Sequence, residues 1–242
     1  MKKQHGFTLV ELSIVLVILG LLAGGILAGQ SLIQSAKLNK ITSDINQYKT
    51  AVLIFEDEYG ELPGDLSIAQ SYWPACTDDS DNECNGNGNG IIETRTGSDD
   101  LLENTRAWEH MQYAGLVAGN LNGIADGINP CSPGINVPEA PNVADGGYNF
   151  ITSSGVYSTD GLGIELAPYN PAFSCTDPGL SGPHIFKIDS KIDDGLPRSG
   201  KVLAEGGFTC PSSSCEFFCF DGNEEYILTD EDSKTCKVFF AF

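Results

Sequence analysis

The feature that most constrains this chain is a long apolar run near its amino end. Nearly every side chain from Phe7 to Ala28 is apolar, and Glu11 is the one charge among them. A run of about 20 apolar residues is long enough to cross a bilayer as a helix. Lys2 and Lys3 precede it, which favours a cytoplasmic amino terminus. The sequence therefore predicts a membrane-spanning helix with the remainder of the chain on the opposite side.

Glu11 separates this run from an ordinary anchor or a cleaved secretory signal. A charged side chain costs about 2.5–3.5 kcal/mol at the centre of a bilayer and less near its surface, so such a residue needs a partner. A secretory signal has a shorter core that ends in a cleavage site of small residues. The small residues between Ala23 and Ala28 leave that interpretation as the alternative.

The residues around Glu11 resemble the prepilin signal of the type IV pilin superfamily. The segment Gly6 to Glu11, GFTLVE, follows a short basic leader and precedes the apolar run. The resemblance implies that a prepilin peptidase cuts after Gly6 and methylates the new amino-terminal residue, Phe7. It also implies that Glu11 balances the amino terminus of a neighbouring subunit when helices stack into a filament. Because an unpaired buried charge costs several kcal/mol, this pairing can help to select the stagger between subunits.

The helix is predicted to continue from the membrane into an aqueous head. Apolar side chains recur at spacings of three and four from Leu38 to Tyr59, which is typical of an amphipathic helix. Gly60 and the Pro63–Gly64 pair end it. We therefore expect a leader at 1–6, a membrane and filament-core segment at 7–29, an amphipathic segment at 30–60 and a globular head at 61–242.

The composition favours an exported, acidic head. The formal net charge is −20, and no basic patch with interleaved aromatic residues occurs. Nucleic-acid binding is not expected, because phosphate contacts need clustered Lys and Arg. The chain has eight cysteines and no Cys-x-x-Cys pair. In an exported chain this pattern indicates disulfides rather than a zinc or thioredoxin-like site.

Cys219 and Cys236 are the favoured disulfide pair. They flank a turn and a strand-like segment, and a bridge between them would join the end of one strand to the start of the last. The arrangement also resembles the C-terminal disulfide loop of pilins. Cys76–Cys84 is a second, local choice. By elimination, the remaining pairs would be Cys131–Cys175 and Cys210–Cys215. The alternative joins Cys215 to Cys236 and Cys210 to Cys219.

A loop rich in asparagine and glycine is a candidate calcium site. Asn85, Asn87 and Asn89 place amide oxygens at alternate positions, as in the first half of an EF-hand loop. Thr96 stands where that loop has its bidentate Glu, and three neutral amides bind calcium weakly. Glu93 and nearby aspartates supply negative charge. The sequence predicts either a weak calcium site at Asn85, Asn87, Asn89 and Glu93 or a turn without metal.

The rest of the head is predicted to be one helix and an antiparallel sheet, an α+β fold. The helix is expected within 96–119, with Trp108 as a core anchor rather than a recognition residue. Residues 120–149 are predicted to be surface loop. The predicted strands are Tyr148–Tyr157, His184–Asp189, Lys201–Ala204, Glu216–Phe220, Glu225–Thr229 and Lys237–Phe242. Asp193 and Asp194 are expected in a solvated turn, with a metal site as the alternative.

No catalytic set emerges from the sequence. His5 lies in the predicted leader, and His110 and His184 fit a structural or surface role better than a catalytic one. The motifs of zinc proteases, serine hydrolases and phosphate-binding loops do not occur. An enzymatic function is therefore not expected.

Together these features predict a pilin-like structural subunit. We expect a single-pass protein of the bacterial inner membrane with a periplasmic head, which a prepilin peptidase processes and which then joins other pilin subunits in a filament. The large head and the cysteine-rich loops favour a minor pilin. One alternative is a pseudopilin of a type II secretion piston. Another is an anchored binding protein that forms no filament.

Overall fold

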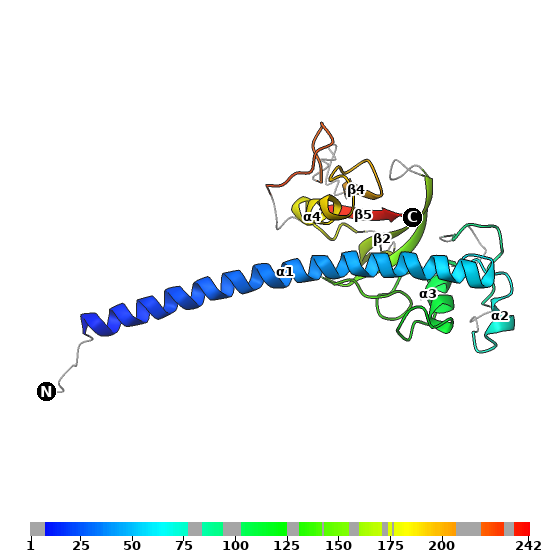
Figure 1. Cartoon of the computed structure of the whole chain (residues 1–242), viewed down its shortest axis with the longest axis horizontal. Helices are drawn as coiled ribbons and strands as arrows, with labels where there is room; N and C mark the ends of the chain where they lie inside the picture. Colours follow the sequence, from blue (N-terminus) through cyan, green and yellow to red (C-terminus); the bar gives the residue numbers. More distant parts are fainter. Residues whose placement is uncertain are drawn as a thin grey trace.

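A long helix carries an α+β head at its carboxyl-terminal end in the computed structural model (Figure 1). The residues described are 8–76, 84–93, 103–124, 131–141, 143–154, 160–170, 174–175, 177–206, 219–229 and 235–242. Helix α1, Leu9–Tyr59, has 51 residues. At 1.5 Å per residue it is about 77 Å long. Its amino-terminal half projects away from the head (Figure 1).

Both ends of α1 are capped as its sequence predicts. Thr8 is the N-cap and forms a capping box with Glu11. Gly60, with φ of 78°, is the C-cap, and its N–H donates to the carbonyl of Glu56. Only glycine adopts this left-handed conformation without steric cost, which explains why the helix stops there.

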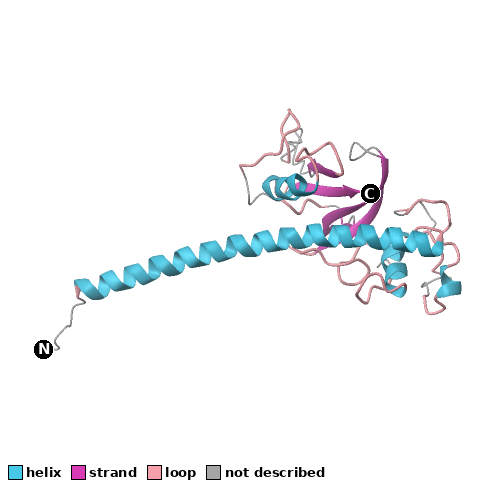
Figure 2. Ribbon diagram, viewed as in Figure 1, coloured by secondary structure: helices cyan, strands magenta, loops and turns pink. Residues whose placement is uncertain are grey.

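The head is built around an antiparallel sheet with the order β1-β2-β5-β4. A short strand, β3, pairs with β2 outside this order. The strands are β1 Gly146–Ser154, β2 Asp160–Asn170, β3 Ser174–Cys175, β4 Val202–Gly206 and β5 Cys236–Ala241. Short helices accompany the sheet in the described part of the chain (Figure 2). They are α2 Ala69–Tyr72, α3 Glu103–Tyr113 and α4 Gly182–Ile192. The predicted α+β architecture, a long helix packed on an antiparallel sheet, is confirmed.

Trp108 of α3 joins the helix to the sheet at the centre of the core. Its side chain is fully buried. Its ring centroid lies 4.8 Å from that of Tyr48 on α1 and 4.4 Å from that of Phe150 on β1. The predicted role of Trp108 as a core anchor agrees with this packing.

The predicted strand at His184–Asp189 is wrong, because these residues lie in α4. Pro183 stands in the first turn of the helix, where its missing N–H has no cost. Ile185 and Ile188 are buried one turn apart, while Lys187 between them is exposed. This three-to-four-residue spacing belongs to an amphipathic helix, and the β-branched side chains gave a misleading strand signal.

Three other predicted elements need correction or fall partly outside the described residues. Glu225–Thr229 is not a strand, and within it only Tyr226 forms an isolated bridge, to Phe220. Of the predicted strand Glu216–Phe220, residues 216–218 lie outside the described part of the chain. The predicted helix over 96–119 is described only from Glu103, and it ends at Tyr113.

Candidate assembly site

The amino end of α1 holds the Glu11 carboxylate against the first turn of its own helix. The Thr8 backbone N–H and the Thr8 hydroxyl both donate to Glu11 Oε2 at 2.8 Å. In return the Glu11 N–H donates to Thr8 Oγ1 at 3.3 Å. A carboxylate here also complements the positive end of the helix dipole. The predicted cleavage residues, Gly6 and Phe7, lie outside the described residues.

The amino-terminal half of α1 exposes apolar side chains around its whole circumference. Leu9 is 87% exposed and Leu27 is 68% exposed. The first buried side chain of the helix is that of Leu38. Among the described residues, α1 is the one helix long and apolar enough to cross a membrane. Such a surface is not stable in water, so lipid or other protein chains must cover it.

Two further apolar side chains on α1 remain uncovered beside the head. Leu53 and Ile54 are 65% and 45% exposed. Val52 and Phe55, their neighbours in the sequence, are buried in the core. The outer face of α1 beside the head is therefore polar apart from these two side chains.

Buried polar contacts fasten the carboxyl-terminal half of α1 to the head. Asp44 is buried, forms an ion pair with Lys40 and accepts a hydrogen bond from the Tyr148 hydroxyl at 3.2 Å. Burial, with the nearby Asp44 carboxylate, raises the pKa of the phenols of Tyr48 and Tyr148. Lys49 donates to the carbonyl of Ala241 at the end of β5. The stalk and the last strand of the sheet are thus joined directly.

Disulfides join segments of the head. The structure pairs Cys219 with Cys236 and Cys76 with Cys84, the two pairs favoured by the sequence, with Cα atoms 5.1 and 5.6 Å apart. Cys131 is also disulfide-bonded. Cys210 and Cys215, which the alternative pairing involves, lie outside the described residues. Cys219–Cys236 ties the segment 219–229 to the start of β5.

The asparagine loop is organised by side-chain acceptors that bind backbone N–H groups. Asn85 Oδ1 accepts from the Gln70 N–H, Asn87 Oδ1 from the Asn89 N–H and Asn89 Oδ1 from the Ile91 N–H. Asn87 Nδ2 donates to Glu93 Oε2 at 2.8 Å. Asn87, Asn89 and Glu93 are therefore linked through hydrogen bonds in the loop, whereas the Asn85 amide oxygen is used by Gln70 of α2.

Two buried carboxylates that the sequence analysis did not single out support this loop. Asp65 accepts the N–H groups of Asn89 and Gly90, at 3.0 and 2.7 Å. Glu103 accepts those of Asn87 and Glu93, both at 3.0 Å. Burial raises the pKa of Glu103 to about 7, against the opposing effect of its two N–H donors. No local motif marks these residues, because each lies outside the loop that it organises.

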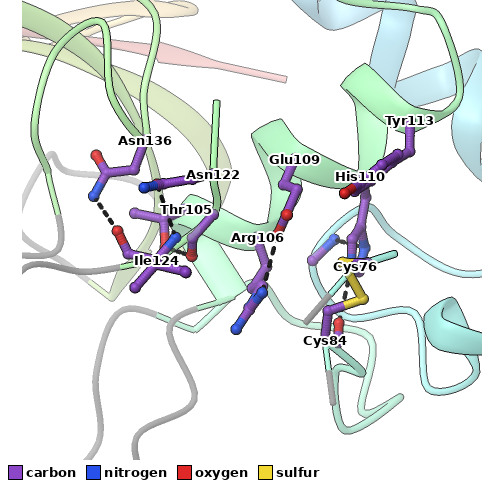
Figure 3. Close-up of polar contacts among 12 residues, drawn as sticks. Cys76, Cys84, Thr105, Arg106, Glu109, His110, Tyr113, Asn122, Ile124 and Asn136 are labelled. Carbon is purple, nitrogen blue, oxygen red and sulfur yellow. Dashed lines mark hydrogen bonds and ion pairs between the residues drawn. A yellow bond between two sulfur atoms is a disulfide. The ribbon is translucent and has the colours of Figure 1, made fainter. Parts of the chain in front are cut away.

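His110 is a structural residue buried beside the Cys76–Cys84 disulfide (Figure 3). Its Nδ1 accepts the Gly64 N–H at 2.9 Å, and its Nε2 donates to the Cys84 carbonyl at 2.9 Å. Burial lowers the pKa of the imidazole to about 4. Both ring nitrogens are thus used in holding the neutral ring, and the two cysteine sulfurs are bonded to each other.

The remaining candidate residues also make contacts that shape the fold. His184 Nε2 contacts Gln34 Nε2 of α1, and its Nδ1 lies 2.8 Å from the Ser181 hydroxyl. Asp193 Oδ2 accepts from the N–H groups of Lys201 and Val202. Asp194 accepts from the Leu196 N–H and the Ser199 hydroxyl, at 2.9 and 2.6 Å. Both aspartates stabilise the turn that leads into β4, as the sequence predicts.

Comparison with known proteins identifies one feature of the chain. Residues 1–27 match the family described as the prokaryotic N-terminal methylation motif. No curated protein and no solved structure gives a significant match to the chain. The match covers the predicted cleavage site, Glu11 and most of the exposed apolar half of α1. Residues 1–27 therefore carry the type IV prepilin-like signature.

Proposed function

We propose that this protein is a structural subunit, a minor pilin, of a type IV pilus-like filament. The observation that carries the proposal is the apolar half of α1, which is exposed on all sides and bears a single carboxylate, Glu11, at its amino end. A prepilin peptidase cuts after Gly6 and methylates Phe7. The helix first anchors the chain in the inner membrane, with the head in the periplasm. It then exchanges lipid for the helices of other subunits.

Glu11 has a defined task in this assembly. After cleavage, the positive amino terminus of one subunit lies close to the Glu11 carboxylate of a neighbour, and the two charges neutralise each other in an apolar environment. A single carboxylate would be costly there without this partner. The capping box supports this proposal, because it holds the carboxylate at the amino end of α1.

The large, disulfide-bonded head favours a minor over a major subunit. A pseudopilin of type II secretion has the same signature and the same kind of helix, so it is the runner-up. In an anchored binding protein without a filament, Glu11 would serve only the capping box with Thr8 and would need no charge partner from a second subunit. The companions encoded beside this chain separate the first two candidates, because pilus and secretion operons encode different partners.

The experiment compares Glu11→Ala with a control, Glu58→Ala, which removes a charge from the exposed other end of the same helix. We expect Glu11→Ala to reach the membrane with a folded head but to be depleted in the sheared filament fraction, because its role is intermolecular. The Glu58→Ala chain should assemble as the parent does. If Glu11→Ala assembles as well as the parent, the pairing of Glu11 with a neighbouring terminus is wrong.

A further inference from the structure

A cavity of about 460 Å³ opens to solvent beside the amino end of β1. Its size is within the range of sites that hold small ligands or single anchoring side chains. Two neighbouring segments line it, 132–140 and 143–146. They supply apolar walls from Pro133, Ile135 and Val143 and two carboxylates, those of Glu139 and Asp145.

Hydrogen bonds of the fold hold the walls of this cavity in place. The Ala140 N–H donates to the carbonyl of Gly146 at 2.8 Å, which joins the two segments. The side chain of Asn136 is buried, accepts from the Ser132 N–H at 2.6 Å and donates to the Ile124 carbonyl at 2.8 Å (Figure 3). A ligand would therefore meet a preformed site, which lowers the entropy cost of binding.

The two carboxylates of the cavity have no counter-charge. Both side chains are exposed, and neither has a hydrogen bond or an ion pair within the described part of the chain. No Lys or Arg occurs between Ala107 and Phe186, a stretch that includes both lining segments. Glu139 Oε1 lies against the opposite wall, since a Cβ at residue 134 would be 2.8 Å from it. The cavity therefore suits a cation that is carried on an apolar stem.

We infer that this cavity receives an arginine side chain of a partner protein. A guanidinium has five N–H donors in a planar fork, so it can bind the carboxylates of Glu139 and Asp145 together, whereas an ammonium is a compact point charge. The aliphatic stem of arginine packs on Pro133, Ile135 and Val143. Arginine is also among the side chains that most often anchor protein interfaces.

The charges of this chain favour a different protein over free arginine or a second copy. Free arginine carries a carboxylate that the two acidic side chains would repel, whereas an arginine within a peptide chain does not. The described arginines of this chain already have partners, because Arg106 is buried and pairs with Glu109, and Arg198 pairs with Glu224. The inference goes beyond the proposed filament role and does not rest on it.

The test uses the full-length chain in detergent micelles and methyl NMR. The probes are arginine blocked as its acetyl methylamide and the equally blocked citrulline, a neutral analogue of the same shape. The arginine probe should give saturable shifts of the methyl groups of Ile135, Ala140 and Val143. The citrulline probe should bind about tenfold more weakly, because it cannot form the two ion pairs.

A cavity variant and a matched control locate the effect. Glu139→Gln/Asp145→Asn should bind the arginine probe about tenfold more weakly than the parent, roughly threefold per carboxylate. Asp145 has a φ of 51°, a conformation that asparagine also tolerates, so this variant should keep the fold. The control Glu56→Gln/Asp57→Asn removes the same charge from exposed positions on α1 and should bind as the parent does.

Four results would overturn the inference. Equal affinity for the arginine and citrulline probes would make the cavity an apolar site only. Unchanged affinity in the cavity variant, or an equal loss in the control, would show that the two carboxylates do not select the ligand. A blocked lysine that binds as tightly as the arginine probe would contradict recognition by the planar fork. Methyl shifts that depend on protein concentration without any probe would assign the cavity to a second copy of the chain.

Discussion

At the scale of single residues, the environment of His110 should make the stability of the fold depend on pH. Protonation would place an N–H on Nδ1, the atom that already accepts the Gly64 N–H. Burial accordingly lowers the pKa of the His110 imidazole to about 4 in the folded state, whereas in the unfolded chain the imidazole has its ordinary pKa of 6.5. Between these values the unfolded state binds more protons, so acidification favours unfolding.

The prediction is that His110 lowers stability by about 3 kcal/mol when the pH falls from 7 to 4. His110→Gln should be less stable at pH 7, because it loses ring packing, but it should lack this part of the pH dependence. Urea unfolding in micelles, followed by the fluorescence of Trp73 and Trp108, measures both. Parallel stability curves for parent and variant over that range would show that His110 titrates normally in the folded state.

Calcium binding at the asparagine loop stays a prediction. A bound ion would have to replace the N–H donors that Asn85, Asn87 and Asn89 now satisfy, so we expect an affinity weaker than micromolar. Isothermal calorimetry on the chain in micelles should give heat that a chelator reverses, and Asn87→Ala with Glu93→Gln should abolish it. The absence of heat and of any shift in melting temperature at millimolar calcium would contradict the prediction.

At the scale of elements, the Cys219–Cys236 disulfide should govern one segment rather than the whole head. It closes a sequence separation of 17 residues. The chain-entropy model assigns such a loop about 3 kcal/mol of stability. In Cys219→Ala/Cys236→Ala we expect faster hydrogen exchange in segment 219–229 and at the amino end of α4, where Gly182 lies close to the carbonyls of Cys219 and Ile227. Exchange in α3 should change least. Uniform acceleration through the head would show that the disulfide supports the fold as a whole.

The sequence predicted elements well where one strong pattern decided the structure. Helix α1 was predictable because a continuous apolar run leads into an amphipathic stripe and ends at Gly60. Strands β1, β4 and β5 were predicted from short apolar runs between turns. Strand β2 was missed, because Gly161, Gly163 and Pro168 interrupt its pattern. The structure explains one of these glycines, since a Cβ at residue 163 would lie 2.3 Å from the Phe239 ring.

In the candidate site, too, the residues that are marked by local sequence could be predicted and those that depend on tertiary packing could not. Glu11 and the exposed apolar surface are encoded in consecutive residues, so the sequence alone identified them. The carboxylates of Asp65 and Glu103 reach the asparagine loop from other segments of the chain. Their positions follow from tertiary packing, which no local spacing reports. The packing of α4 on α1 was likewise hidden, because α4 was assigned to a strand and Lys191 contacts Asn39 from a helix.

At the scale of the whole molecule, the structure has two parts with different solvents. The head buries a core around Trp108 and is acidic and disulfide-bonded, which suits an oxidising aqueous compartment. The apolar half of α1 is suited to lipid or to a bundle of like helices. One helix continues through both parts, so forces on the stalk reach the sheet through Asp44, Tyr148 and Lys49.

Cleavage after Gly6 and methylation of Phe7 are the events on which the proposed filament role depends most directly. Mass spectrometry of the chain extracted from membranes should show a protein that begins at Phe7 and carries one added methyl group on its amine. A Gly6 variant with a bulky side chain should keep its leader and fail to assemble. A chain that starts at Met1, or one cleaved beyond Ala23, would contradict the prepilin account.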